Sequence, residues 1–403
     1  MFHSCRHCGS PLNHTVIDLG HQPPSNAYLT TEHLLGPEIT YPLQVYVCTT
    51  CWLMQLPAHA SAHELFTADY AYFSSTSSSW CAHAKSFVEQ AVDRLGLGAD
   101  SQVVELASND GYLLQYMQQL GIPCLGIEPT RATAEAARAK GIETLERFFG
   151  LALAEELPPA DLVVANNVLA HVPDINDFVA GIARLLKPKG RVSIEFPHLL
   201  RLLKGNQFDT IYHEHYSYLS LRTVQRIAAA YGLEVVDVEQ LPTHGGSLRV
   251  WLAKSGVTEP TAAVGALLID EAEAGLESLA AYADFQSRAE TAKHALLEFL
   301  LQAKRSGQRV LGYGAAAKGN TLLNYAGIKA DLVPAVADRA CSKQGKMLPG
   351  SHIPVIRAEE LDAQNPDVLL VLPWNLINEL REQLPAYELV TAIPKLQRWI
   401  KEN

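Results

Sequence analysis

The densest group of titratable and aromatic side chains in this sequence lies in one short run, from Phe208 to Leu219. It reads Phe-Asp-Thr-Ile-Tyr-His-Glu-His-Tyr-Ser-Tyr-Leu. A histidine has an ordinary pKa near 6.5, so it can accept a proton at neutral pH, and a neighbouring glutamate can orient it or raise its basicity. A tyrosine hydroxyl can donate a hydrogen bond to an oxyanion as it forms. The run therefore predicts a site of proton abstraction.

Two other interpretations of this run stay open. His213 and His215 could lie on one face of a strand and ligate a metal, although the sequence offers no evident third ligand. The histidines and tyrosines could also be packed in the core. Two histidines elsewhere are candidates as well. His171 lies just beyond a predicted strand and is a second candidate base, and His244 lies in a flexible turn, Thr-His-Gly-Gly-Ser, as a substrate contact or only a loop residue.

Four cysteines near the N-terminus form two knuckles, Cys5-x-x-Cys8 and Cys48-x-x-Cys51. Each knuckle can place two thiolates on one ion, and four sulfurs close the tetrahedral shell of zinc. We predict a structural zinc ion that supplies folding energy to a segment with little core of its own. Four unligated cysteines are the alternative.

A polar turn after the stretch Val103–Leu106 predicts a cofactor site, because open α/β sheets bind nucleotide-like ligands where a strand ends. The G-x-G-x-x-G spacing is absent, and Glu105 and Asp110 would repel a pyrophosphate, yet they suit an ammonium and a sulfonium. Glu128, about 20 residues on, is placed to accept hydrogen bonds from two ribose hydroxyls. These features predict S-adenosylmethionine; acidic residues that merely face solvent are the alternative. The predicted cofactor contacts are Glu105, Ser108, Asn109, Asp110, Glu128 and Asn166.

A second loop of small residues, Gly312 to Thr321, leaves a predicted strand and opens a predicted helix. Small residues let backbone N–H groups approach a phosphate, the helix N-terminus adds a partial positive charge, and Lys318 adds a full one. The loop is neither a Walker loop nor a dinucleotide fingerprint, so it fits a diphosphate that is bound and not cleaved. The predicted substrate contacts in this half are Gly314, Lys318, Asn320, Asp338, Lys343 and Asn375.

The elements that must position these residues fall into two α/β halves. Short apolar runs separated by amphipathic stretches predict parallel, doubly wound sheets. Residues 262–305, rich in Ala, Leu and Glu, predict one or two long linking helices, and the first sixty residues predict irregular, turn-rich structure. The expected fold is α/β, with two doubly wound Rossmann-like domains: a class I methyltransferase fold and a smaller C-terminal nucleotide-binding domain, beside a small N-terminal zinc lobe. The expected boundaries are 1–65, 66–257 and 258–403.

Composition excludes several classes of function. The 403 residues carry a formal net charge of −11, so there is no basic field to attract nucleic acid. No stretch approaches the roughly 20 apolar residues that span a bilayer, so we expect no membrane segment. The N-terminus lacks the long apolar core of a secretory signal, so we expect a cytoplasmic protein.

Taken in order, these motifs resemble those of the S-adenosylmethionine-dependent sugar C-3′-methyltransferases, which act on nucleotide-linked 4-keto deoxyhexoses. The resemblance covers nearly the whole chain and depends mainly on the His-Glu-His run together with the Gly-Tyr-Gly loop. It implies an N-terminal zinc lobe, a central S-adenosylmethionine domain and a C-terminal domain that holds the nucleotide. It also implies that a base removes the C3′ hydrogen and that the enolate takes the methyl group.

The resemblance further implies roles for single residues. His215 is the expected base, and Tyr212 and Glu214 are expected to place it and the sugar. A family tyrosine near the cofactor corresponds to Tyr70 or Tyr72; we assign Tyr72 to the cofactor and Tyr70 to the substrate. The expected ligand is a dTDP- or GDP-linked sugar, with no nucleic acid or membrane partner, and the expected assembly is a monomer or weak dimer.

Two alternatives from other functional classes stay open. One is a zinc-containing RNA methyltransferase, against which the negative charge and the separate anion loop argue. The other is a non-catalytic module that binds zinc and a nucleotide.

Overall fold

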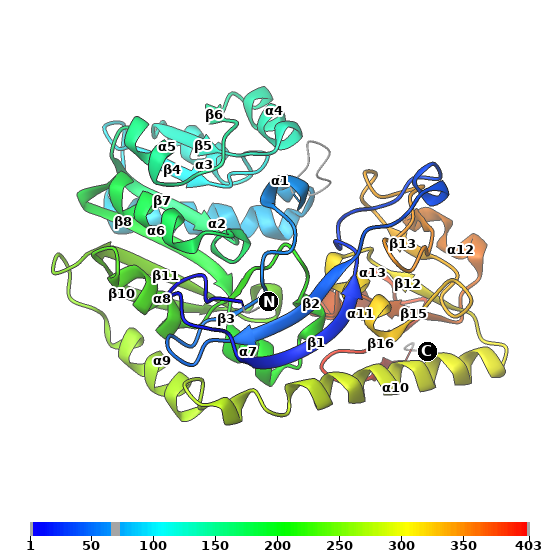
Figure 1. Cartoon of the computed structure of the whole chain (residues 1–403). Coiled ribbons are helices and arrows are strands. Elements are labelled where there is room, and N and C mark those ends of the chain that lie inside the picture. Colours follow the sequence, from blue (N-terminus) through cyan, green and yellow to red (C-terminus); the bar gives the residue numbers. More distant parts are fainter. Residues whose placement is uncertain (1–2, 66–72, 401–403) are drawn as a thin grey trace.

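A computed structural model of the chain describes residues 3–65 and 73–400, and the described residues form three sheets (Figure 1). We name them the N-terminal, central and C-terminal sheets. None of the helices in the described ranges combines the length and hydrophobicity that a membrane span requires.

The central sheet has the strand order β10-β11-β8-β7-β4-β5-β6. Its middle strands are parallel, and β10 and β11 are antiparallel additions at one edge. The strands are β4 (Val103–Leu106), β5 (Cys124–Ile127), β6 (Thr144–Leu145), β7 (Ala160–Asn166), β8 (Leu186–Pro197), β10 (Leu233–Leu241) and β11 (Ser247–Lys254). The helices of this part are α2 (Ser78–Leu95), α3 (Leu114–Gln119), α4 (Arg131–Ala139), α5 (Leu151–Glu156), α6 (Ile175–Leu185), α7 (Leu199–Lys204) and α8 (Leu221–Ala229).

The apolar runs that predicted strands in this half are the buried strands of the sheet. β4 is buried along its whole length because helices cover both faces of a doubly wound sheet. Helix starts follow side-chain caps: Ser77 accepts a hydrogen bond from Trp80 N at the start of α2, and Asp174 accepts one from Asp177 N at the start of α6. The predicted α/β fold class is confirmed.

The C-terminal sheet has the order β14-β13-β12-β15-β16-β17, parallel except for β17. Its strands are β12 (Val310–Tyr313), β13 (Val336–Asp338), β14 (Val355–Arg357), β15 (Val368–Val371), β16 (Glu388–Thr391) and β17 (Gln397–Trp399). Its helices are α11 (Ala317–Ala326), α12 (Leu361–Gln364) and α13 (Ile377–Gln383). The predicted linking helices are α9 (Ala262–Glu273) and α10 (Phe285–Arg305), and Figure 1 shows α10 running beneath β1 and the C-terminal sheet.

The N-terminal sheet shows that one prediction was wrong. The first sixty residues are not simply irregular, because β1 (His14–Gln22) and β2 (Tyr41–Val47) pair as a long antiparallel ribbon. Alternating apolar residues in these strands pack in the same core as α10 and the C-terminal sheet. Two further strands, β3 (Met54–Gln55) and β9 (Ser217–Tyr218), complete this sheet, and α1 (Ala62–Leu65) follows β3. Because β9 lies within the histidine-rich run and pairs with β3, that run is attached to the N-terminal lobe.

Candidate active site

The four knuckle cysteines converge as a metal site. Their sulfur atoms all lie within 4.8 Å of one another, with Sγ–Sγ distances of 3.5 Å for Cys5–Cys51 and for Cys8–Cys48. A tetrahedron with Zn–S bonds of about 2.3 Å has sulfurs about 3.8 Å apart, so the geometry fits zinc. The cluster holds a structural zinc ion, as predicted from the spacing.

The predicted cofactor residues gather at the carboxyl ends of β4, β5 and β7. The Asn109 N–H donates to Glu128 Oε2 at 2.9 Å, so the turn after β4 is joined to the end of β5. Ser74 N–H donates to Asn109 Oδ1, and Ser75 N–H donates to the Asp110 carboxylate. The serine-rich stretch before α2 therefore covers the turn.

Three buried oxygens at this edge have no hydrogen-bond partner among the described residues: Glu105 Oε2, Ser108 Oγ and Asn166 Oδ1. Burial raises the pKa of Glu105 well above its ordinary value, and the nearby Glu128 and Asp110 raise it further. Buried polar atoms normally find partners. A ligand with an ammonium group and hydroxyls would supply them, so these residues fit S-adenosylmethionine.

The histidine-rich run meets His171 next to this edge. The ring of His215 lies 4.6 Å from that of His171 and 3.9 Å from that of Tyr212 (centroid distances). His171 ends the short helix Leu169–His171 after β7, and the Tyr216 N–H donates to Ala170 O at 2.8 Å, which fastens the run there. The sequence offered the two histidines as separate candidates, and the fold brings them into contact.

The hydrogen bonding of His215 fixes its tautomer. Its Nδ1 lies 2.7 Å from Thr210 O. A carbonyl oxygen can only accept, so Nδ1 carries the proton and the lone pair is on Nε2. Burial and the neighbouring His171 lower the pKa of His215 well below its ordinary value, and burial lowers that of His171 to about 4. Both imidazoles are neutral at pH 7, as a general base must be.

His213 and Glu214 face other partners. His213 Nε2 lies 3.3 Å from Tyr41 O, and the described residues provide no third ligand for a metal shared with His215. Glu214 is buried, its Oε1 accepts from Asn26 Nδ2 at 3.1 Å, and burial raises its pKa. Asn26 belongs to the turn after β1, and no local pattern linked it to the site.

The second loop lies at the start of α11. Lys318 Nζ donates to Asn375 Oδ1 at 2.8 Å and lies 4.7 Å from the centroid of the Trp374 ring. Asp338 Oδ2 accepts from the Ala315 N–H at 2.6 Å. Predicted contacts in this half therefore surround one loop.

The N-terminal lobe also reaches this loop. The Tyr28 hydroxyl donates to Ala315 O, and Lys343 Nζ donates to the same carbonyl at 2.9 Å. The buried Asn320 donates from Nδ2 to Ser25 O at 2.6 Å, and its Oδ1 has no partner in the described part of the chain. Gly314 has a φ of +81°, and a Cβ there would lie 2.5 Å from the Pro373 side chain, so the loop requires glycine.

Asp209 is a site residue that sequence reasoning missed. It is fully buried, its Oδ2 accepts from Trp374 Nε1 at 2.7 Å, and its Oδ1 has no partner among the described residues. Burial raises its pKa to about 6, against the opposing effect of Lys318. The available signal was a carboxylate next to an aromatic residue at the start of the histidine-rich run, Phe208-Asp209. Trp374 joins the C-terminal domain to the histidine-rich run through this hydrogen bond.

His244 lies in the short helical turn Thr243–Gly245 between β10 and β11, with a left-handed φ of 53°. Its ring centroid is 5.2 Å from that of Trp80, and burial, together with Lys318, lowers its pKa to about 4. Tyr70 and Tyr72 lie outside the described residues.

Comparison with known proteins agrees with this arrangement. Three family models match: "Putative zinc binding domain" at residues 5–66, "Methyltransferase domain" at 80–238 and "C-methyltransferase C-terminal domain" at 242–394. The chain is 36% identical over 381 residues to C-methyltransferase NovU from Streptomyces niveus, covering 93% of this chain and 90% of NovU.

Two more distant similarities concern the central part alone. A ubiquinone biosynthesis O-methyltransferase from Pseudomonas fluorescens is 31% identical over 106 residues, which are 25% of this chain and 45% of the relative. The crystal structure of magnesium protoporphyrin IX methyltransferase (ChlM) from Synechocystis PCC 6803 with bound SAH superposes with a TM-score of 0.36 at 17% identity, covering 43% of this chain and 83% of that one.

Proposed function

Because this chain belongs to the family of S-adenosylmethionine-dependent sugar C-methyltransferases, we propose that it methylates C3′ of a nucleotide-linked 4-keto-6-deoxyhexose. The observation that carries the proposal is the meeting of three groups from separate segments. His171 follows β7 at the cofactor edge, and the ring of His215 touches that of His171. Lys318 from the anion loop lies 4.7 Å from the Trp374 ring, whose indole N–H donates to Asp209 of the histidine-rich run. Membership of an enzyme family removes the non-catalytic module as an alternative.

His215 is the general base in this proposal. A ketone at C4′ acidifies the C3′ hydrogen, and Nε2 of the neutral His215 takes that proton, so Nε2 becomes protonated and the substrate becomes an enolate. The Thr210 carbonyl keeps Nδ1 protonated and so keeps the lone pair on Nε2. His171 is the second candidate base, because its ring is in contact with that of His215 and it is also neutral at pH 7.

Tyr212 and Glu214 are assigned to placing the base and the sugar. Tyr212 lies against the His215 ring at 3.9 Å between centroids. The buried Glu214 has one oxygen bound to Asn26 and a second, Oε2, without a partner among the described residues. The Glu214 Oε2 is therefore available to accept a hydrogen bond from a sugar hydroxyl.

The cofactor edge holds S-adenosylmethionine through the residues predicted for it. Bound S-adenosylmethionine supplies an electrophilic methyl group that the C3′ carbanion takes, leaving S-adenosylhomocysteine. Asp110 offers a negative charge to this positively charged ligand, and Glu105 Oε2, which has no partner among the described residues, can accept a hydrogen bond from it. Glu128, beside the turn after β4, is assigned to the ribose. We keep Tyr72 as a cofactor contact and Tyr70 as a substrate contact.

The C-terminal domain is assigned to the nucleotide. The N-terminus of α11 and Lys318 offer positive charge to a diphosphate, and Asn320, Asp338, Lys343 and Asn375 surround the same loop. A dTDP- or GDP-linked sugar fits this chemistry, and His244 is assigned to the sugar side. We further propose three parts, 1–65, 66–257 and 258–403, in a cytoplasmic monomer or weak dimer.

A thermal-shift titration tests the proposal. The melting temperature is measured with S-adenosylhomocysteine present and with dTDP, UDP, GDP or single-stranded RNA added, because a ligand that binds only the native state stabilises it by about 2.7 kcal/mol at 100 times its Kd. One nucleoside diphosphate is expected to raise the melting temperature and to lose this effect in Lys318→Met. Lys329→Met, beyond the other end of α11, is the control. Stabilisation by RNA alone, or by none of the four, would refute the nucleotide-sugar assignment.

A further inference from the structure

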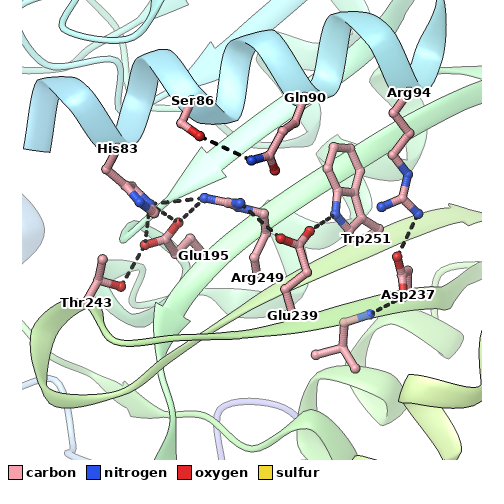
Figure 2. Close-up of polar contacts among 11 residues, drawn as sticks. His83, Ser86, Gln90, Arg94, Glu195, Asp237, Glu239, Thr243, Arg249 and Trp251 are labelled. Atoms are coloured by element: carbon pink, nitrogen blue, oxygen red, sulfur yellow. Dashed lines mark hydrogen bonds and ion pairs between the residues drawn. The ribbon is translucent and has the colours of Figure 1, made fainter.

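A buried charged network joins α2 to the strands β8, β10 and β11 of the central sheet (Figure 2). Its centre is Glu195 on β8, whose side chain has 0% exposure. Glu195 Oε2 lies 2.8 Å from His83 Nε2 of α2 and 3.0 Å from Arg249 Nη2 of β11, and Oε1 accepts from Thr243 Oγ1 at 3.0 Å. Arg249 continues to Glu239 Oε2 of β10 at 3.3 Å. We call these five residues the Glu195 network.

Burying these charges is costly. A carboxylate and a guanidinium lose their hydration in the interior, and apolar residues of similar size often give equal or greater stability. The Arg249 side chain is only 3% exposed. A network of this kind is poor evidence for stability, so its position in the fold is the more informative property.

The network lies at the reacting edge of the central sheet. Glu195 is the register partner of Asn166, the last residue of β7 and a predicted cofactor contact. The Asn167 N–H donates to Glu195 O at 2.7 Å. The backbone of Glu195 therefore borders the cofactor edge, while its side chain turns toward α2 and the 243–246 turn.

The 243–246 turn has an unfavourable backbone conformation. His244, Gly245 and Gly246 have φ values of 53°, 90° and 117°, and a left-handed conformation is costly for a residue with a Cβ such as His244. A Cβ on Gly245 would lie 2.5 Å from Trp374. Thr243 begins the turn, and its hydroxyl bond to Glu195 ties the turn to the rigid centre of the sheet.

Glu195 is also linked to the His244 ring through His83 and Trp80. His83 stacks on Trp80 with centroids 4.9 Å apart, and Trp80 lies 5.2 Å from His244. The Glu195 carboxylate thus binds both Thr243, which precedes His244, and His83, which stacks on Trp80. The far end of the network is anchored, because Glu239 Oε1 accepts from Trp251 Nε1 at 2.8 Å.

We propose that Glu195 is a positioning residue for methyl transfer, which holds the 243–246 turn and the Trp80 face of α2 so that His244 meets the substrate in one orientation. This inference rests on the proposed function, because the substrate that His244 contacts is the one that the proposed function names. In this proposal Glu195 contacts neither the C3′ atom of the sugar nor the methyl group. It acts through Thr243 and His83.

Thr243→Val tests the proposal, because valine keeps the shape of threonine and removes the bond to Glu195. We expect kcat for methyl transfer to fall about 10- to 100-fold, as for other losses of supporting hydrogen bonds, with little change in the Kd of S-adenosylhomocysteine. Thr243→Ser restores the hydroxyl and should restore kcat. The matched control is Thr261→Val, which removes a threonine hydroxyl from another carboxylate of the same domain, Asp237, at 2.6 Å. Its kcat should stay at the wild-type value.

A second readout needs no substrate. Hydrogen–deuterium exchange of residues 243–247 should speed up in Thr243→Val, because the Gly246 N–H is bonded to Thr243 O within the turn. If wild type transfers methyl groups and Thr243→Val does so equally well, or if Thr243→Ser fails to restore the loss, the positioning role is wrong. If wild type itself shows no transfer, the proposed function has failed, and unchanged exchange in Thr243→Val would then overturn this inference separately.

Discussion

At the scale of single residues, the unusual feature is a pair of neutral histidines in contact. His215 and His171 come from segments far apart in the sequence, and burial keeps both unprotonated at neutral pH. A neutral imidazole whose lone pair is fixed on Nε2 by a backbone carbonyl is ready to accept a proton.

The first prediction is that His215→Asn lowers kcat for methyl transfer by about 10²–10⁴-fold, the usual contribution of a general base. The Kd values of S-adenosylhomocysteine and of the nucleotide should change little, because neither site uses His215. Steady-state kinetics and calorimetry measure the two effects. His213→Asn is the control: it is the same substitution two residues away, and His213 faces Tyr41 O. Equal turnover in wild type and His215→Asn would exclude His215 as the base.

The second prediction concerns acid stability. The pKa of His171 is lowered to about 4 from an unfolded value near 6.5, so between these values the unfolded chain binds more protons. Unfolding then becomes easier as pH falls, and the stability present above pH 6.5 is lost toward pH 4. His171→Asn should remove about 2–3 kcal/mol of this pH dependence, measured by denaturant unfolding at pH 7 and pH 4.5. Parallel pH profiles for both proteins would show that His171 is not buried as described.

At the scale of elements, the sequence predicted the two α/β halves well. Strands such as β4 and β15 are buried along their whole length and are apolar except for Glu105 in β4, and such runs are easy to recognise. The strands β1 and β2 were missed because Gly and Pro residues around them outweighed a period-two pattern. The residue types of the site were also predictable, whereas partners such as Asn26 for Glu214 depend on tertiary packing that no local pattern encodes.

The third prediction concerns the effect of the zinc lobe on methyl transfer. β3 follows the second knuckle and pairs with β9, which is part of the histidine-rich run. Cys48→Ser should therefore lose its zinc, become protease-sensitive within residues 1–65, and lower kcat/KM by about tenfold or more, because structural zinc supplies folding energy. Elemental analysis, limited proteolysis and kinetics give the three readouts.

Cys341→Ser is the control for that experiment, since Cys341 is exposed and outside the cluster. It should keep one zinc ion per chain and wild-type kinetics. Full zinc content in Cys48→Ser would refute the four-thiolate site, and full activity without zinc would show that the lobe does not support the histidine-rich run.

At the scale of the whole molecule, the three parts meet around one short segment. The histidine-rich run touches the N-terminal lobe through Asn26 and the C-terminal domain through the bond from Thr321 Oγ1 to Ile211 O, at 2.9 Å. The central sheet alone therefore lacks several contacts that hold the proposed base. Contacts of this kind can couple nucleotide binding in the C-terminal domain to the histidine-rich run, and the bond from Trp374 Nε1 to Asp209 Oδ2 at 2.7 Å is another of them.

The last prediction tests this coupling with Trp374→Phe. Phenylalanine keeps an aromatic face for Lys318 and removes the indole N–H that donates to the buried Asp209. Because a buried carboxylate that loses a partner is penalised, the free energy of unfolding should fall by about 1–3 kcal/mol. The Kd of the nucleotide should stay the same while kcat falls several-fold, since the binding loop is intact and only its link to the histidine-rich run is broken. The control is Trp399→Phe in β17, whose indole N–H has no partner among the described residues. If both variants lose the same stability and turnover, the Trp374–Asp209 bond carries no coupling; if nucleotide affinity falls with kcat unchanged, Trp374 belongs to the nucleotide site instead.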